Sequence, residues 1–196
     1  MTVADDWILF LDVPLTEKLD YFSAASAIMY ALYSTAIRTF HLYTNSGSRS
    51  TSSTSSSSAH ALKPWALTCL VVYIGHVTYL SILPRFDYTY NMAFNLTLGL
   101  AHNFLWIIYA LPSSRSFLPR FPFRSKDYRP AFVNKALVFV LVTTAATALE
   151  LLDFPPWMFI IDAHALWHLS TVPITKLWYD FLVEDALDEG WKLQKS

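Results

Sequence analysis

Long apolar segments alternate with short polar connectors along this chain. A helix that crosses a bilayer needs about 20 mostly apolar residues, and five segments reach or approach that length. They cover residues 20–41, 64–83, 90–111, 132–152 and 157–182. The last segment matches least well, because it contains several polar residues and Pro173. The pattern predicts an all-α polytopic membrane helix bundle with about five spanning helices, and a flexible Ser-rich linker over residues 45–60.

The composition agrees with a membrane protein. Of the 196 residues, 54% are hydrophobic and 15% are charged, and the mean hydropathy is +0.34. Soluble domains carry roughly 25% charged residues. The net charge of −1 argues against a nucleic-acid partner, and the single cysteine, Cys69, excludes an internal disulfide. The first residues, "MTVADDWILF", are acidic and do not predict a signal peptide.

Basic residues in the connectors predict the orientation, because short cytosolic loops are enriched in Lys and Arg. One side would carry only Lys18 and Arg85. The other side would carry nine basic residues: Arg49, Lys63, Arg115, Arg120, Arg124, Lys126, Arg129, Lys192 and Lys195. The C-terminal tail is therefore predicted to be cytosolic, and the turns "PRFDY" and "LLDFPP" to face the opposite compartment.

The stretch "IDAHALWHLS" (161–170) places His164 and His168 four residues apart in an apolar segment. Residues at this spacing share one helix face, so both imidazoles can reach one metal ion. Asp162 lies about 200° around the helix from His164 and cannot join them. A helix that begins near Trp157 would put His164 roughly 10 Å below its end. Hydrogen bonding of the histidines to neighbouring helices is the alternative interpretation.

Asp20 is the strongest candidate partner for these histidines on the same side of the membrane. A carboxylate can act as general base toward a water near a metal. Favourable placement near a helix N-terminus is an alternative role for it, which Glu17 would serve equally well. Other polar residues in the apolar segments are His76, Asn91, Asn95 and His102, of which His102 is expected to be structural.

Three blocks of the sequence resemble a known family. They are "PLTEKLDYFSA" (14–24), "HVTYLSILPRFDYTYNM" (76–92) and "LELLDFPPWMFIIDAHALWHLSTVP" (149–173). Their order and spacing resemble the Per-like family of membrane hydrolases that remodel the lipid of glycosylphosphatidylinositol (GPI) anchors. The resemblance covers about residues 12–185. It implies hydrolysis of an acyl ester at the sn-two position, GPI-anchored proteins and membrane lipid as substrates, and a place in the endoplasmic reticulum or Golgi membrane.

The resemblance also implies a site. The family is placed with the alkaline ceramidases in the CREST superfamily of seven-helix proteins, which implies a zinc ion held by three histidines near a serine and an aspartate. Two of these histidines map onto His164 and His168, and the aspartate maps onto Asp20. The third histidine and the serine would fall at positions 9 and 5, which are Leu9 and Asp5. Neither residue can take the implied role, so weak zinc binding is expected.

The predicted domain organisation has three parts. They are an atypical N-terminus (1–12), a membrane helix bundle (13–185) that resembles a truncated seven-helix fold, and a cytosolic tail (186–196). A truncated or mis-started hydrolase is the simplest explanation. The alternatives are a non-catalytic membrane subunit or pseudoenzyme fragment, and a haem-binding electron carrier. The last fits less well, because two histidines on one helix turn suit a single tetrahedral ion better than the two axial positions of one haem.

Overall fold

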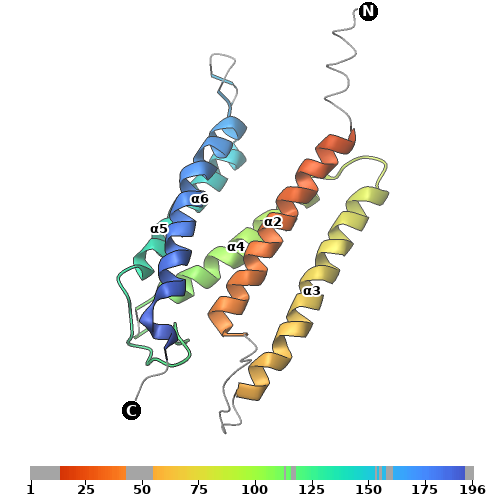
Figure 1. Ribbon diagram of the computed structural model, residues 1–196. Coiled ribbons are helices and arrows are strands. Elements are labelled where there is room, and N and C mark those ends of the chain that lie inside the picture. Colours follow the sequence, from red (N-terminus) through yellow and green to blue (C-terminus); the bar gives the residue numbers. More distant parts are fainter. Residues whose placement is uncertain are drawn as a thin grey trace, which may run out of the picture. The chain divides into compact units, whose positions relative to one another are not determined.

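The computed structural model is all-α over the residues it describes, which are 14–42, 55–112, 114–115, 118–152, 154, 156–157 and 161–192. The atypical N-terminus, with Asp5 and Leu9, and positions 45–54 of the Ser-rich linker lie outside these residues. Five α-helices and one short 3₁₀ helix follow in order (Figure 1): α2 (Pro14–Phe40), α3 (Ser55–Ile82), α4 (Tyr88–Ala110), α5 (Val133–Leu152), α6 (Ala163–Leu187) and η1 (Glu189–Trp191). The described residues form no sheet, only an isolated bridge between Trp157 and Ile161.

Three helices begin at different places from those that the apolar pattern predicts. The first begins at Pro14 rather than at residue 20, because the fixed φ of proline suits the first helical position. The second begins at Ser55 rather than at residue 64, so residues 55–60 of the predicted Ser-rich linker are helical and Pro64 lies inside the helix. The last begins at Ala163 rather than near residue 157, and it continues through Pro173 to Leu187. Apolarity alone misplaces these three starts, because proline and capping residues set the end of a helix locally and a helix can extend into polar residues.

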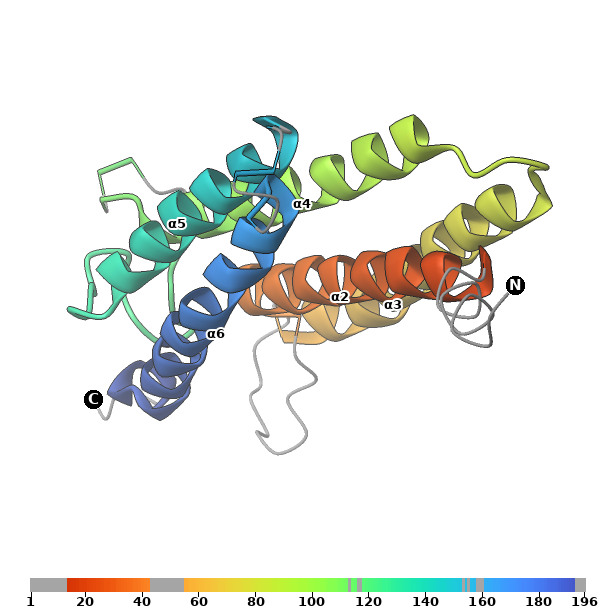
Figure 2. The same cartoon turned by 90° about the horizontal axis from the view of Figure 1, so that it is seen from above.

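The chain divides into two units, residues 1–102 and 103–196. In the first unit, α2 and α3 run side by side and antiparallel (Figures 1 and 2). The Tyr73 hydroxyl donates to the carbonyl of Phe22 at 3.1 Å. Farther along the pair, the Trp65 indole donates to the carbonyl of Tyr33 at 3.2 Å. These two bonds fix the register of the two helices.

In the second unit, α5 packs along α6 over an aromatic core. The Trp178 ring lies 4.3 Å from that of Phe139 and 5.3 Å from that of Phe181. Trp106, from the last turns of α4, meets Phe181 edge-on at 5.1 Å. Edge-on and offset rings are the favourable arrangements for aromatic pairs. This core joins the end of α4 to both C-terminal helices.

The connector between α4 and α5 folds over the end of α4 through two arginines. Arg120, only 2% exposed, donates to the carbonyl of Tyr109 at 2.9 Å and to that of Leu111. Arg129 donates to the carbonyl of Ala110 at 2.6 Å. The last carbonyls of a helix have no partner within it, and the guanidinium groups supply one. Burial, and then the charge of Arg129, lower the pKa of Arg120.

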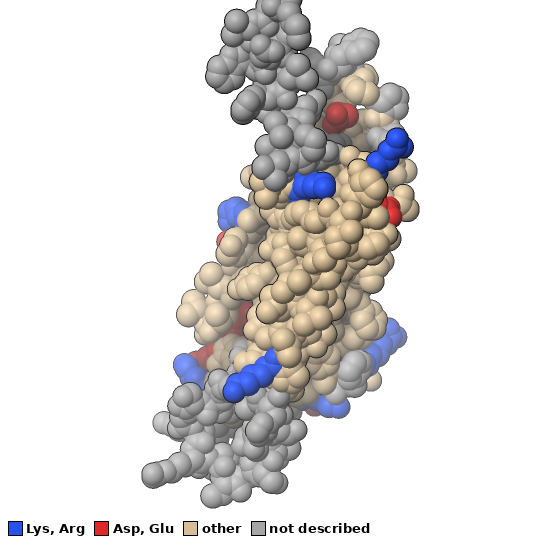
Figure 3. Space-filling view, turned by 90° about the vertical axis from the view of Figure 1, so that its right-hand side faces the viewer, with Lys and Arg blue, Asp and Glu red and all other residues tan. Residues whose placement is uncertain are grey.

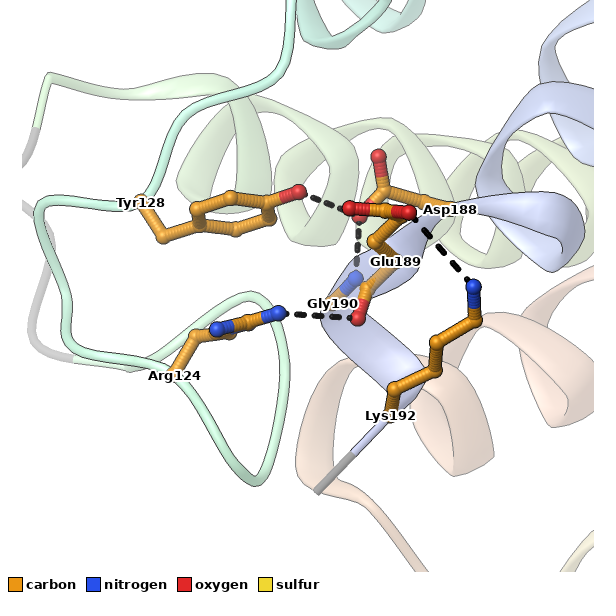
Figure 4. A network of polar contacts seen from close by, with 6 residues as sticks. All are labelled: Arg124, Tyr128, Asp188, Glu189, Gly190 and Lys192. Atoms are coloured by element: carbon orange, nitrogen blue, oxygen red, sulfur yellow. Dashed lines mark hydrogen bonds and ion pairs between the residues drawn. The ribbon is translucent and has the colours of Figure 1, made fainter. Parts of the chain in front are cut away.

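The same connector holds the C-terminal end of α6 (Figure 4). The Asp188 carboxylate accepts from the Tyr128 hydroxyl at 2.9 Å and from the Gly190 amide at 2.6 Å. Arg124 donates to the carbonyl of Glu189 at 3.1 Å. Burial, and then the bond to Asp188, raise the pKa of Tyr128.

One face of α3 is apolar and exposed. Leu67 and Val71 are 61% and 60% exposed, and Leu70 and Ile74 on the same face are exposed as well. Figure 3, which views the side where α3 lies, shows a broad uncharged face with Lys and Arg toward its ends. A contiguous exposed apolar surface is unfavourable in water. Among the described residues, Ala61–Ile82 and Tyr88–Ala110 are long and apolar enough to cross a membrane, and α5 has a shorter apolar stretch, Val133–Leu149.

Candidate functional site

The two histidines of "IDAHALWHLS" lie at the very start of α6. Asp162 adopts an extended conformation before the helix, and its carboxylate accepts from the amide of Ala165 at 2.7 Å. It is thus the N-cap of α6, a structural role that satisfies an otherwise free amide. His164 and His168 are the second and sixth residues of the helix. They therefore lie in the first two turns of α6, closer to its N-terminal end than a start near residue 157 would have put them.

The His168 side chain is exposed, and its ring meets the Trp167 ring edge-on at 4.6 Å. The hydroxyl of Thr171 donates to the carbonyl of His168 at 2.7 Å, which involves the backbone and not the imidazole. The side chain of His164 lies outside the described residues. Joint metal binding by the two imidazoles therefore stays a prediction from their spacing.

Asp20 lies in the second turn of α2, because the helix begins six residues earlier at Pro14. Its side chain is exposed, and its carbonyl accepts from the hydroxyl of Ser23 at 2.8 Å. The stabilisation of an acid by the helix dipole falls off within the first turn. That alternative explanation for Asp20 is therefore weakened, whereas Glu17, the fourth residue of α2, is placed to fill it.

Two residues near Asp20 were not singled out by sequence reasoning. Phe86 stacks on Tyr21 with ring centroids 4.9 Å apart, and Asp87 accepts from the amide of Tyr90 at 2.9 Å. The sequence carried a signal for Asp87, since an acid just before an apolar run is a typical N-cap. It carried none for the contact of Phe86 with a helix more than 60 residues away.

The first unit also buries a polar cluster between α3 and α4. His76 is 1% exposed and stacks on Phe94 with centroids 3.9 Å apart. The amide of Asn91 lies near its ring, but neither ring nitrogen completes a hydrogen bond within the described part of the chain. Asn95 donates to Asn91 at 3.3 Å. His76 lies toward the C-terminal end of α3, and Asn91 and Asn95 lie toward the N-terminal end of α4. The sequence had shown only that they are polar residues in apolar segments.

Comparison with known proteins settles the family. The model of the Per1-like family matches residues 8–186. The chain belongs to the Per1-like family. "GPI-specific phospholipase A2-like PGAP3" of Homo sapiens is 36% identical over 176 residues, which are 90% of this chain and 46% of that protein. "Protein PER1 homolog" of Schizosaccharomyces pombe is 39% identical over 174 residues, 88% of this chain and 45% of that protein.

This Per1-like chain spans about half the length of the curated relatives it matches. The frog relative from Xenopus tropicalis, also named "GPI-specific phospholipase A2-like PGAP3", is 37% identical over 90% of this chain and 47% of its own. No solved structure matches the chain. The resemblance inferred from the three sequence blocks is thus confirmed at the level of the family.

The described residues of this Per1-like chain do not by themselves complete a zinc site. Within them, no group of three or more His, Cys, Asp or Glu side chains is arranged to hold a metal ion. Asp20 belongs to the first unit, and His164 and His168 to the second. The assembly of these three residues into one site therefore remains a prediction that rests on family resemblance.

Proposed function

We propose that this chain is the membrane-embedded part of a hydrolase that remodels the lipid of GPI anchors. Its substrates would be GPI-anchored proteins, and the reaction would be hydrolysis of the acyl ester at the sn-two position. The observation that carries the proposal is the family match over residues 8–186, which includes the histidine pair and Asp20. The names of the relatives support the substrate class.

The proposed setting is the endoplasmic reticulum or Golgi membrane. All five helices would span it as part of a seven-helix CREST-like bundle, with the C-terminal tail in the cytosol and the start of α6 at the lumenal face. The exposed apolar face of α3 supports burial in lipid. The length of α2 and α6, 27 and 25 residues, is sufficient for a tilted span.

In the proposed chemistry, Asp20 takes a proton from a water molecule that attacks the ester carbonyl. The bond between the acyl carbon and the glycerol oxygen breaks, and the leaving oxygen takes up a proton, so that a fatty acid and a lyso-lipid result. His164 and His168 would supply two of the ligands for zinc, which when bound contributes Lewis acidity at the ester carbonyl. Their place in the first two turns of α6 would bring them near the depth of lipid ester groups if this end of the helix lies at the membrane face.

A second candidate function is a non-catalytic membrane subunit or pseudoenzyme. Leu9 favours it, because this position would hold the third histidine in the resemblance and leucine cannot bind a metal. On this alternative the histidine pair would not bind zinc tightly.

Metal analysis of the purified chain separates these two functions. We expect weak zinc binding by the wild-type chain, stronger binding in Leu9→His, and loss of the metal in His164→Ala and His168→Ala. His60→Ala is a matched control, because no role is assigned to this histidine, and it should keep the metal. A folded wild-type chain without zinc, to which Leu9→His restores metal binding, would instead favour the pseudoenzyme.

The activity itself is tested in cells that lack their own Per1-like protein. Mass spectrometry of the anchor of a GPI-linked reporter shows whether its sn-two acyl chain is removed when this chain is expressed. We expect removal with the wild-type chain or with the Leu9→His, Asp5→Ser variant. An unchanged anchor in both cases, at normal expression of the protein, contradicts the hydrolase.

A further inference from the structure

The turn between α3 and α4 is held rigidly by the helices that it connects. Asp87 caps α4, since its carboxylate accepts from the amide of Tyr90 at 2.9 Å and its carbonyl from the amide of Asn91 at 3.0 Å. The other carboxylate oxygen accepts from the hydroxyl of Tyr79, on α3, at 3.4 Å. One side chain thereby ties the end of α3 to the start of α4, so that its neighbour Phe86 has a fixed position.

The ring of Phe86 reaches from this turn to the early part of α2. It stacks on Tyr21 at 4.9 Å with an interplanar angle of 26°, and it lies 6.4 Å from the ring of Phe22. Tyr88 completes the cluster, edge-on to Tyr21 at 5.7 Å and 5.0 Å from Phe86. All of these separations are within the range of favourable aromatic pairs.

This aromatic contact bears on the residue that directly precedes Tyr21, which is Asp20. The ends of helices fray unless they are tied down, and Asp20 lies only six residues from the start of α2. The Tyr73 hydroxyl fixes the backbone at Phe22, and the stack on Phe86 fixes the side of α2 that faces the turn. Together these two contacts fix the position of α2 along its axis and its rotation about that axis, and so fix where α2 presents Asp20.

We propose that Phe86 is a positioning residue for Asp20. The inference rests on the proposed function, in which Asp20 acts as the base. Phe86 itself would not touch the substrate. It would hold α2 so that the carboxylate lies at the depth of the ester group, and a displacement of about 1 Å at such a group can lower turnover about 100-fold.

A spin label next to Asp20 tests the positional part of the proposal without any need for activity. The label is attached at Leu19→Cys in the full chain with Cys69→Ser. We expect Phe86→Leu to increase the mobility of the label and Phe86→Tyr to leave it unchanged. Phe40→Leu, at the other end of α2, is the matched control and should have no effect. Unchanged mobility in Phe86→Leu overturns the proposal.

Should Phe86→Leu fail to fold, Tyr21→Leu removes the other half of the stack. The same increase in label mobility is then expected. A folded Tyr21→Leu protein with an unchanged label contradicts the proposed role of the stack.

Kinetics on a GPI-anchored reporter in micelles test the functional part. Phe86→Leu should lower kcat about 10- to 100-fold with KM unchanged, and Phe86→Tyr should restore it. A higher KM with unchanged kcat would mean that Phe86 binds substrate, which overturns the positioning role. If Asp20→Asn keeps full activity, the proposed function of Asp20 fails. If Asp20→Asn is inactive and Phe86→Leu is normal, only the present inference fails.

Discussion

The two ends of α6 use polar residues in opposite ways. At the C-terminal end, Asp185 is 3% exposed and accepts from the Tyr109 hydroxyl at 2.7 Å, and Asp188 accepts from Tyr128. At the N-terminal end, Asp162 caps its own helix and His168 is exposed. The C-terminal end is joined by hydrogen bonds to distant segments, whereas the N-terminal end carries the exposed imidazole of His168. The buried polar residues of α6 thus join segments of the fold, whereas a chemical role for the exposed His168 stays a prediction.

The largest effect on stability is expected at Arg120, in the connector that also holds the C-terminal end of α6. Arg120→Ala removes the guanidinium that donates to the carbonyl of Tyr109 and, together with Arg129, to that of Leu111. Because bonds to charged donors are worth about 1.5–3 kcal/mol each, we expect a loss of about 3 kcal/mol in the free energy of unfolding. Chemical denaturation in mild detergent measures it. Arg115→Ala, an exposed residue of the same connector, should change little, and equal losses in both variants would contradict the structural role.

Gly190 should show the next largest effect. A Cβ atom at this position would lie 2.5 Å from the ring of Phe121, so Gly190→Ala requires the connector to shift. Overpacking of this kind costs about 1–3 kcal/mol.

Gly99→Ala is the control for Gly190, because a Cβ atom there would meet nothing within 4 Å. We expect it to be neutral or slightly stabilising, since glycine is unfavourable inside a helix. A Gly190→Ala protein as stable as the Gly99→Ala protein would show that η1 is not packed on the connector.

At the other end of α6, Asp162→Ala should cost about 1 kcal/mol, the usual value of an N-cap. Asp162→Ser keeps a capping oxygen and should retain most of the stability. Thermal unfolding of the two variants in detergent compares them. Equal destabilisation by serine and alanine would contradict the role of Asp162 as the N-cap of α6.

The smallest effect on stability is expected for His168→Ala. Substitutions of exposed residues usually change stability by no more than about 0.5 kcal/mol. The same substitution should abolish zinc binding, which metal analysis detects. Leu169→Ala is the exposed neighbour that should change neither property. A strong loss of stability in His168→Ala would place this histidine with the joining residues instead.

Local patterns in the sequence accounted for much of the fold. The apolar runs indicated five helices, and each of the five helices in the described residues overlaps one of them. The starts of α2 and α6 were misplaced by six residues each, because Pro14 and Asp162 set these starts and hydrophobicity does not register them. The start of α3 was misplaced by nine residues, because its first residues are polar. Leu9 and Asp5 depart from the zinc site that the resemblance implies. They lie outside the described residues, so this departure is known from the sequence alone.

The sequence by itself determined the helix spacing of His164 and His168 and the family, because four-residue spacing and linear motifs need no information on distant contacts. Only the tertiary structure decided that Arg120 and Asp185 join segments and that Phe86 stacks on Tyr21. The physical reason is that burial and partnership depend on residues brought together from far apart in the chain, and a one-dimensional pattern carries no record of which partner each side chain meets.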